Sequence, residues 1–286
     1  MASVTDFLAL DDHRADTLES ILTRAIGYAQ AWRERQVPQA LQGVRVALVV
    51  DDSGWRNTTA FELGIKVMGG LCVRAPISLA GNEAVGDLAQ YLDNWFDIVV
   101  IRTPDLGQLR RLAEAATLPV INARTRSNHP CETLGDLAYV LQQRGNLSGL
   151  RVGVVAPDGN ILGSWAEAAA ALSIEVVPER WHARRFAKIE RFSATTEMGA
   201  LASADVVITD SWPEDVEPAE VLDYQITAAT LEHFAPDELI PCPPVTRGQE
   251  VTADAMVSPS CHVIAAKAFL LHAQNALLEA VAQTIR

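Results

Sequence analysis

The sequence predicts an α/β protein with two doubly wound, parallel-sheet domains in series. Three observations support this fold class. The chain has 286 residues, enough for two domains of ordinary size. Short apolar strands alternate with helical segments through its first half. The same alternation restarts after the turn-rich segment "RGNLSGL" at 144–150. We therefore expect a first domain over 1–148, joined by the final helix over 264–286, and a second domain over 149–263.

The first half of the chain contains the elements of one α/β domain. Leu18, Ile21, Leu22 and Ala25 form the apolar face of a helix expected over 16–34. Asp16 and Glu19 have the spacing of a capping box at its start. The remaining expected elements are strands over 44–50, 97–101 and 119–122, with helical segments over 60–68 and 82–92.

The second half repeats the pattern. The strands expected there are 151–156, 174–178, 204–210 and 238–242, and a helix is expected through "SWAEAAAALS" at 164–173. The last segment, 263–286, reads as one long amphipathic helix. We expect this helix to pack back on the first domain.

Composition excludes several classes of partner. The net charge of −13 argues against nucleic acid or an anionic membrane. No apolar stretch is long enough to cross a bilayer, and the start of the chain carries acidic residues where a signal peptide needs basic ones. The four cysteines show no CxxC or Cys/His spacing, which favours reduced thiols in a cytoplasmic protein. No metal ligand set is indicated.

Polar clusters follow the expected strands. In open α/β sheets ligands bind beyond the carboxyl ends of the strands. The clusters at such positions are "DDSGWRN", "RTPD", "NARTRSNHPCE", "PDGN", "DSW" and "PCPPVTRG". The stretch "SGWRNTTAFELG" at 53–64 joins a strand end to a helix start, where free backbone N–H groups can hold a phosphate. These clusters predict a site for a small ligand, including an anion.

The segment "HPCETLGDL" at 129–137 resembles the aspartate/ornithine carbamoyltransferase family, which carries HP-x-Q and a leucine-rich helix here. Further segments follow in the family's order over nearly the whole chain: "FELGIKVMGG", "DIVVIR", "PVINA", "ADVVITDSW", "PCPPVTRGQEV" and "LLHAQNALL". The resemblance implies a carbamoyl-phosphate domain, an amino-acid domain and a homotrimer with active sites at subunit interfaces. It also implies transfer of a carbamoyl group from carbamoyl phosphate to an amine, without cofactor or metal.

The family's phosphate loop, S-T-R-T-R, falls on 54–58, where only the central arginine, Arg56, matches. The resemblance implies that Arg56 contacts phosphate, for which a guanidinium is well shaped; the alternative is a surface arginine at a helix start. Gly54 and Trp55 remove two hydroxyl donors, and Thr58 replaces an arginine. Ser53, Asn57 and Thr58 are the residues expected to replace part of the lost binding.

Three further donor-side residues match the family, and one departs from it. Arg102 matches an arginine that binds phosphate and the carbonyl group, and Arg247 matches one that closes on the carbonyl group from the second domain. His129 matches the histidine that donates to the carbamoyl oxygen, although a histidine that only caps a helix is the alternative. Glu132 replaces the family glutamine. As a carboxylate it can accept from an NH₂ group but adds negative charge beside an anionic ligand.

The second domain resembles the ornithine type. Asp210 and Trp212 match its D-x-W, Cys242 matches the cysteine of its H-C-L-P, and Asn160 survives from its G-D-G-N-N segment. A packed, inert side chain is the alternative for Cys242. The family's S-M-G is replaced by Glu214, Asp215 and Val216. The added acids indicate a more cationic acceptor than ornithine, unless they belong to a solvated loop.

The sequence therefore favours a divergent carbamoyltransferase that acts on the amine of a non-standard amino acid. One alternative is a catalytically silent homologue that binds a metabolite or a partner, because the phosphate loop has lost polar groups. Another is a cleft adapted to a different donor that lacks phosphate, since fold does not determine function.

Overall fold

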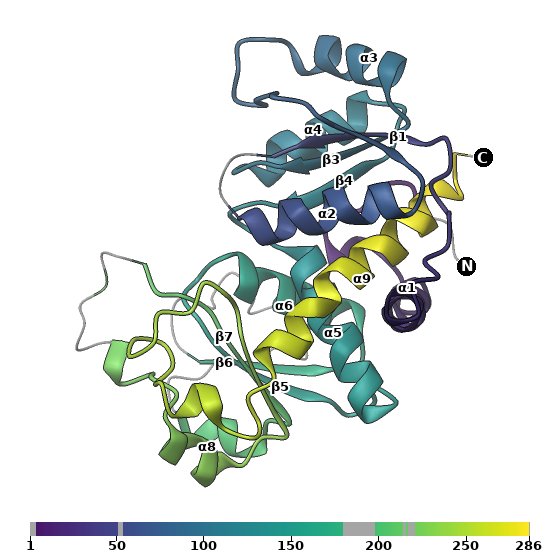
Figure 1. Ribbon diagram of the computed structural model, residues 1–286. Coiled ribbons are helices and arrows are strands. Elements are labelled where there is room, and N and C mark those ends of the chain that lie inside the picture. Colours follow the sequence, from purple (N-terminus) through teal and green to yellow (C-terminus); the bar gives the residue numbers. More distant parts are fainter. Residues whose placement is uncertain (1–3, 51–53, 180–197, 214–215, 217–220, 286) are drawn as a thin grey trace. The chain divides into compact units, whose positions relative to one another are not determined.

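The computed structural model describes residues 4–50, 54–179, 198–213, 216 and 221–285 (Figure 1). The chain forms two compact units. The first contains Met1–Gly145 and Lys267–Arg286, and the second contains Asn146–Ala266. In the described part of the chain, no helix is both long and apolar enough to span a bilayer.

The first unit is built on a four-stranded parallel sheet. Its strands are β1 (Arg45–Val49), β2 (Leu71–Arg74), β3 (Ile98–Arg102) and β4 (Val120–Arg124). They lie in the order β2-β1-β3-β4. From β1 the chain goes to β2 on one side of β1 and then crosses to β3 on the other side. The switch point of the sheet therefore lies between β1 and β3. At such a point the carboxyl ends of the strands leave room for a ligand.

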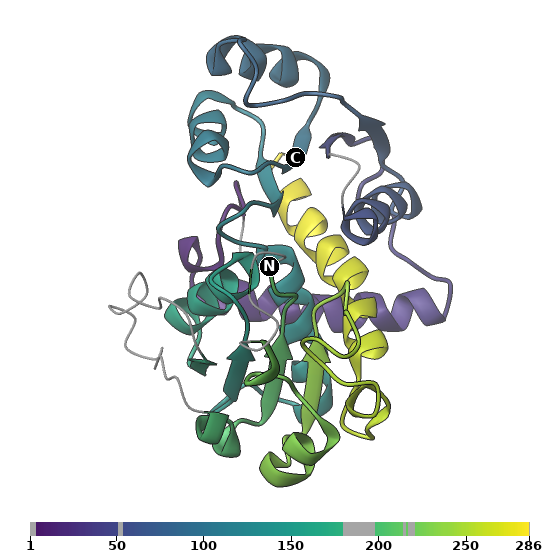
Figure 2. The ribbon, with the colours of Figure 1, turned by 90° about the vertical axis from the view of Figure 1, so that its left-hand side faces the viewer.

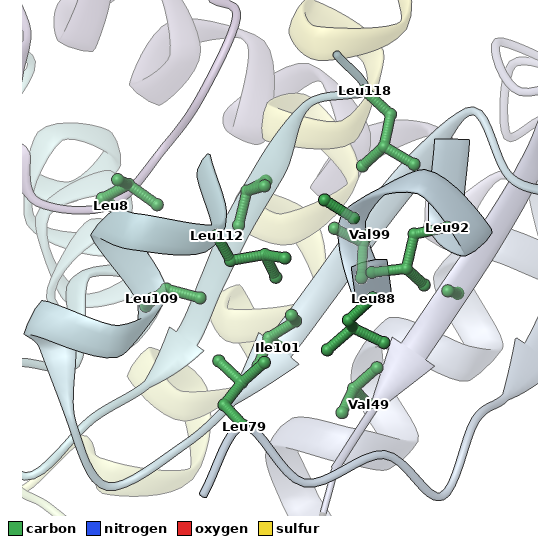
Figure 3. Packing of buried hydrophobic residues seen from close by; sticks show 13 residues of the cluster. Leu8, Val49, Leu79, Leu88, Leu92, Val99, Ile101, Leu109, Leu112 and Leu118 are labelled. Carbon is green, nitrogen blue, oxygen red and sulfur yellow. The ribbon is translucent and has the colours of Figure 1, made fainter. Parts of the chain in front are cut away.

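Helices cover both faces of this sheet. On one face, α3 (Val85–Trp95) and α4 (Leu106–Ala115) bury leucines against Val49, Val99 and Ile101 (Figure 3). Alternate strand residues point to opposite faces. The opposite face carries α2 (Trp55–Val67) and α9 (Val263–Ala282), as Figure 1 shows. The remaining helices are α1 (Ala15–Arg33), α5 (Pro130–Arg144) and the short η1 (Leu10–Asp12).

The second unit repeats this topology. Strands β5 (Arg151–Val155), β6 (Glu175–Glu179), β7 (Val206–Thr209) and β8 (Glu238–Pro241) form a parallel sheet in the order β6-β5-β7-β8. Its described helices are α6 (Asn160–Ala171), α8 (Ala228–Phe234), η3 (Met198–Ser203) and η4 (Ala255–Val257). A cluster around Val155, Leu201, Trp212 and Leu239 forms part of the core of this unit.

The predicted fold class is confirmed: both sheets are parallel, and the C-terminal helix packs on the first unit. Some local predictions differ. The capping box at Asp16 does not form, because α1 begins at Ala15 and the Asp16 carboxylate accepts from Arg14 instead (3.0 Å). Helix α2 begins at Trp55, five residues before the predicted start at 60. Strand β2 and helix α4 were not predicted.

The helix α9 packs closely on α5, beside which both ribbon views place it (Figures 1 and 2). Gly135 of α5 makes this approach possible. A Cβ atom at this position would lie 3.0 Å from the backbone nitrogen of Leu270 and 3.1 Å from its Cα. Because these are backbone atoms, a side chain there can be accommodated only if a whole helix moves.

Gly135→Ala is expected to destabilise the protein by about 1–3 kcal/mol, the usual cost of overpacking, although alanine is the better helix former. Gly86→Ala in α3 is the matched control, because nothing lies within 4 Å of the added methyl group. It should be neutral or stabilising by up to about 1 kcal/mol. Urea denaturation measures both. Equal effects of the two substitutions would contradict the packing argument.

Candidate active site

Two features of the first unit meet at the carboxyl edge of its sheet: the end of β3 and the start of α2. Gly54, the N-cap residue of α2, has φ 71° and ψ 47°. A Cβ atom on it would lie 2.2 Å from Nη1 of Arg102, the last residue of β3. The left-handed backbone conformation favours glycine at this position, and the atoms that a Cβ would meet are the far end of the Arg102 side chain. The guanidinium of Arg102 thus lies against the N-terminus of α2, where backbone N–H groups already favour an anion.

Arg56 lies in the first turn of the same helix. Its side chain is exposed, and its guanidinium lies 5.0 Å from the centre of the Trp55 ring. The charge of Arg56 also acts on the carboxylate of Glu132, whose pKa it helps to lower. The structure therefore places Arg56 and Arg102, two of the predicted site residues, at one edge of the first unit. Ser53, a third predicted residue, lies outside the described residues.

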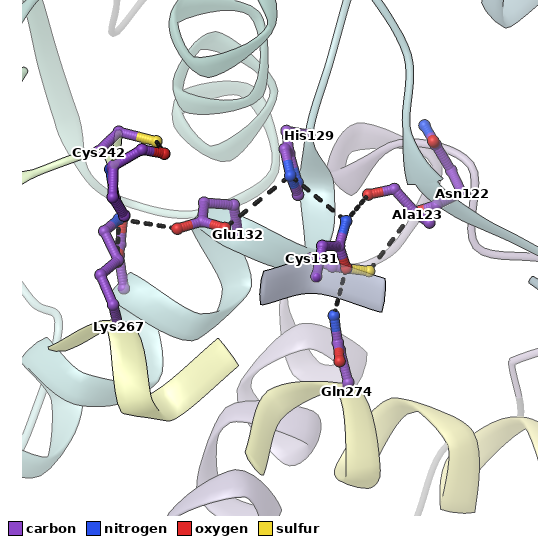
Figure 4. A network of polar contacts seen from close by, with 11 residues as sticks. Asn122, Ala123, His129, Cys131, Glu132, Cys242, Lys267 and Gln274 are labelled. Carbon is purple, nitrogen blue, oxygen red and sulfur yellow. Dashed lines mark hydrogen bonds and ion pairs between the residues drawn. The ribbon is translucent and has the colours of Figure 1, made fainter. Parts of the chain in front are cut away.

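His129 is the N-cap residue of α5 and is buried. Its Nε2 atom lies 3.4 Å from Nδ2 of Asn57 and 3.9 Å from a carboxylate oxygen of Glu132 (Figure 4). Burial is the main cause that lowers the pKa of His129 to about 4, and the charges of Arg124 and Arg102 add to it against the opposing effect of Glu132. The imidazole is therefore neutral at neutral pH.

Asn57 determines which nitrogen of His129 carries the proton. The Asn57 amide donates to the Ala123 carbonyl (2.7 Å) and accepts from Nε2 of Gln274 (2.6 Å), which fixes the orientation of the amide. Its NH₂ group consequently faces Nε2 of His129, so that this nitrogen accepts and Nδ1 carries the hydrogen. Asn57 is thus a buried residue of α2 whose side chain contacts His129 and is hydrogen-bonded to β4 and α9. Thr58, next to it, is buried as well.

Glu132 belongs to a buried group of three charges. The ammonium of Lys267 lies 3.0 Å from a carboxylate oxygen of Glu132 and 2.7 Å from one of Asp136 (Figure 4). All three side chains are at most 10% exposed. From the sequence, Glu132 is expected to add negative charge beside an anionic ligand, and no pattern assigns it Lys267 as a partner. The only signal was a single lysine within the apolar run "VIAAKAFLL".

The two carboxyl groups differ in their titration. Burial raises the pKa of Glu132, but Lys267 and His129 outweigh it, and the pKa lies below its usual range. Burial raises the pKa of Asp136, and Glu132 adds to this, since two carboxylates share one ammonium. Glu132 is thus the carboxylate that stays ionised beside His129.

In the second unit, Asp210 and Cys242 lie at the carboxyl ends of neighbouring strands. Thr209 and Pro241 are paired in the sheet, and the backbone N–H of Cys242 donates to the carbonyl of Thr209 (2.8 Å). Asp210 and Cys242 directly follow this last pair, so both residues leave the sheet at the same edge, from neighbouring strands. One oxygen of the Asp210 carboxylate accepts from the N–H of Ser211 (2.9 Å).

Three further predicted residues belong to this unit: Asn160, Trp212 and Arg247. Asn160 is the first residue of α6, shortly after β5, and β5 neighbours β7. Trp212 follows Asp210 closely, and its buried indole N–H has no hydrogen-bond partner among the described residues. Arg247 is exposed in the loop after β8, where its charge acts on Cys261.

Two parallel sheets of equal strand order, each with polar side chains at its carboxyl edge, define a two-domain α/β protein of the doubly wound type. Comparison with known families identifies it further. Residues 5–142 match the carbamoyl-P binding domain, and residues 148–281 the Asp/Orn binding domain, of aspartate/ornithine carbamoyltransferase. The chain belongs to the aspartate/ornithine carbamoyltransferase family.

Individual relatives agree with this assignment. The chain is 30% identical over 293 residues to the ornithine carbamoyltransferase of Nitrobacter winogradskyi, with 95% of each chain covered. It is 30% identical over 298 residues to that of Symbiobacterium thermophilum, with 96% of each covered. The solved ornithine carbamoyltransferase of Pyrococcus furiosus superposes with a TM-score of 0.92 at 27% identity, over 100% of both chains.

Lys267→Met should destabilise the protein by about 3–5 kcal/mol, because it leaves two buried carboxyl groups without their cation. Urea denaturation at neutral pH measures this loss. Lys66→Met is the control: Lys66 pairs with Glu62 at 2.6 Å but its side chain is 56% exposed, so the cost should stay below about 1 kcal/mol. A loss of that small size in Lys267→Met would show that the buried charges are not coupled as described.

The neutral state of His129 predicts a pH dependence of stability. The ordinary pKa of 6.5 applies in the unfolded chain, which binds a proton there as the pH falls, whereas the folded protein does so only near its pKa of about 4. Lowering the pH from 7 to 5 should therefore remove about 2 kcal/mol of stability through this group.

The measurement compares the free energy of unfolding of the wild type with that of His129→Gln across this pH range. The variant cannot bind the proton, so the difference between the two proteins should change by that amount between pH 7 and 5. A constant difference would mean that the imidazole titrates alike in both states.

Proposed function

We propose that this protein transfers a carbamoyl group from carbamoyl phosphate to the amine of an amino acid. Membership of the family supports transfer of this group. The observation that carries the proposal is the guanidinium of Arg102 against the N-terminus of α2 at Gly54, within the domain that matches a carbamoyl-P binding domain. An arginine and a helix N-terminus together suit a phosphate.

On the donor side, Arg56 and Arg102 bind the phosphate, with Ser53 and Thr58 as additional donors. His129 donates from Nδ1 to the carbonyl oxygen, on which negative charge develops in the transition state. Asn57 positions this imidazole through its hydrogen bond to Nε2. Glu132 accepts from the NH₂ group of the carbamoyl moiety. Because Lys267 compensates its charge, Glu132 repels the phosphate less than an isolated carboxylate would.

On the acceptor side, Asp210 and Cys242 flank the reacting amine, with Asn160 and Trp212 binding the rest of the amino acid and Arg247 assisting at the carbonyl group. The amine must arrive unprotonated, since its lone pair forms the new C–N bond. The bond between the carbonyl carbon and the phosphate oxygen breaks, phosphate leaves, and the nitrogen loses a proton. The position of Asp210 and Cys242 directly after the paired residues Thr209 and Pro241 supports their joint role.

Two acceptors are candidates. The relatives are named ornithine carbamoyltransferases, which makes ornithine the first amine to test. The replacement of the family's S-M-G by Glu214, Asp215 and Val216 favours a non-standard amino acid with more positive charge than ornithine. We adopt the second as the proposal, because carboxylates attract a cationic substrate and the S-M-G segment holds the ornithine backbone in the family.

A homotrimer and a cytoplasmic location complete the proposal. Large apolar side chains are exposed on the first unit, among them Trp55 (64%), Leu71 (60%) and Trp95 (61%). Contact with further copies of the chain would cover such side chains. Free Cys72, Cys131, Cys242 and Cys261 fit a reducing compartment.

The test is an assay of phosphate release and ureido-product formation with carbamoyl phosphate and a panel of amines. The panel contains ornithine, lysine, arginine-like amino acids with an added amine, and aspartate as a control without a side-chain amine. The highest kcat/KM is expected with a cationic amino acid other than ornithine. Fastest turnover of ornithine would overturn the acceptor assignment alone. No product with any amine, in a protein that binds carbamoyl phosphate, would favour the silent homologue.

Arg102→Gln should lower kcat/KM by about 10²–10³-fold, the usual effect of removing one group that stabilises developing charge. Arg110→Gln is the control, because Arg110 pairs with Asp12 at 3.0 Å on the surface and should leave turnover unchanged. Circular dichroism and the unfolding midpoint show that both variants fold. Equal activity of Arg102→Gln and the wild type would refute the donor site.

A further inference from the structure

The pairing of β3 and β4 contains an irregularity at its carboxyl end. Val99, Val100 and Ile101 pair with Val120, Ile121 and Asn122 in regular register. Arg102 should then pair with Ala123, but it pairs with Arg124. One extra residue of β4 is therefore inserted opposite β3, which is a β-bulge. Bulges redirect side chains and are frequent beside active sites.

The shift changes which side chains are neighbours. Residues paired across two strands point to the same face of the sheet, and a displacement of one residue reverses the face. Without the bulge, Arg102 would stand beside the methyl group of Ala123. With it, Arg102 and Arg124 stand beside one another at the carboxyl edge, next to the switch point of the sheet.

The backbone around Arg124 is held firmly. Its carbonyl accepts from the N–H of Thr103 (3.0 Å), and the N–H of Arg126 donates to the carbonyl of Pro104 (3.0 Å). The next residue, Thr125, is locked to Asn128 by a side-chain hydrogen bond of 2.7 Å and by a backbone one of 2.8 Å. The position of Arg124 is thus set by the fold and not by a flexible loop.

Within the part of the chain that the structure describes, the side chain of Arg124 has no counter-charge. It is half-buried, and among the described residues it makes no ion pair or hydrogen bond. Like charges that face one another across two strands are unfavourable. Its charge nevertheless acts on His129, and lowers the pKa of that imidazole more than Arg102 does. Arg124 therefore lies close to the donor-side group, in an arrangement that an anion would stabilise.

We propose that Arg124 is a further binding residue for the anionic donor and supplies, with Arg56 and Arg102, a third guanidinium at this edge. The inference rests on the proposed function, and it explains how the site tolerates the altered loop. Thr58 stands where the family's loop has its second arginine. Arg124 returns one positive charge to the site from β4 instead of α2. The phosphate oxygens are its expected partners, because a guanidinium binds them with two hydrogen bonds.

The experiment is a calorimetric titration of the full-length protein with inorganic phosphate and with carbamoyl phosphate. Arg124→Gln is compared with Arg126→Gln, a matched control that removes the same charge from an exposed residue two positions away. Arg124→Gln should weaken binding of both ligands about 10- to 100-fold, the range for hydrogen bonds to a charged group. Arg126→Gln should change it less than about twofold, as expected for a screened surface charge.

A thermal unfolding measurement separates ligand binding from a structural role. A ligand that binds the folded state raises the midpoint. Phosphate should raise it in the wild type and in Arg126→Gln, but much less in Arg124→Gln. Without phosphate, the midpoint of Arg124→Gln should equal or exceed that of the wild type, because a repulsion between like charges is removed. A lower midpoint without phosphate, with the phosphate effect intact, would show a structural role and overturn the inference.

Kinetics distinguish this inference from the proposed function. In Arg124→Gln, KM for carbamoyl phosphate should rise by the same factor as the dissociation constant, with kcat changed less, and Arg124→Lys should restore part of the affinity. Unchanged KM and phosphate affinity in Arg124→Gln would overturn the inference and leave carbamoyl transfer intact. Weakened phosphate binding in a protein that transfers no carbamoyl group would support Arg124 while the proposed function fails. A wild type that binds no phosphate would overturn the inference.

Discussion

The buried ammonium of Lys267 is the interaction on which the first unit's polar interior depends. It balances Glu132 and Asp136 at 3.0 and 2.7 Å, where water cannot. Since Lys267 lies on α9, the C-terminal helix is part of the charge balance beside His129. The same helix supplies Gln274, which orients the amide of Asn57 and so fixes the tautomer of His129. The chemistry of a domain built from the first half of the chain is thereby completed by its last twenty residues.

Local charge and total charge have opposite signs in this protein. The chain carries −13 overall, yet Arg56, Arg102 and Arg124 gather at one edge of the first sheet. Such a contrast concentrates a small anion at this edge while the remaining surface repels larger polyanions. Among the described residues, the carboxylate of Glu132 lies beside His129 at this edge, and it is paired with the buried ammonium of Lys267. Glutamate in place of the family glutamine looks unfavourable in an anion site. The ion pair between Glu132 and Lys267 makes this substitution compatible with such a site.

The sequence predicted the elements with strong periodicity and missed those without it. The central strands of both sheets are continuous apolar runs, buried on both faces, and they were found within one or two residues. Strand β2 lies at the sheet edge, where Leu71 and Val73 are exposed, so its short pattern resembles a loop. Asp105 is the N-cap residue of helix α4, and its carboxylate accepts from the N–H of Gly107 at 2.7 Å. Asp105 is also the last residue of the polar cluster "RTPD", which the sequence pattern alone assigns to a ligand site.

Local sequence by itself determined the two-domain α/β class, the family and the strand ends that carry Arg102, Asp210 and Cys242, because these follow from short periodic patterns and from motifs in order. Only the tertiary structure decided the partner of Glu132, the internal role of Asn57 and the place of Arg124. Glu132 and Lys267 are brought together by helix packing across more than half of the chain. The bulge that aligns Arg124 with Arg102 is a shift of one residue between two strands. No local sequence pattern predicts the ion pair of Glu132 and Lys267 or the bulge between β3 and β4. Both features arise from contacts between separate segments of the chain.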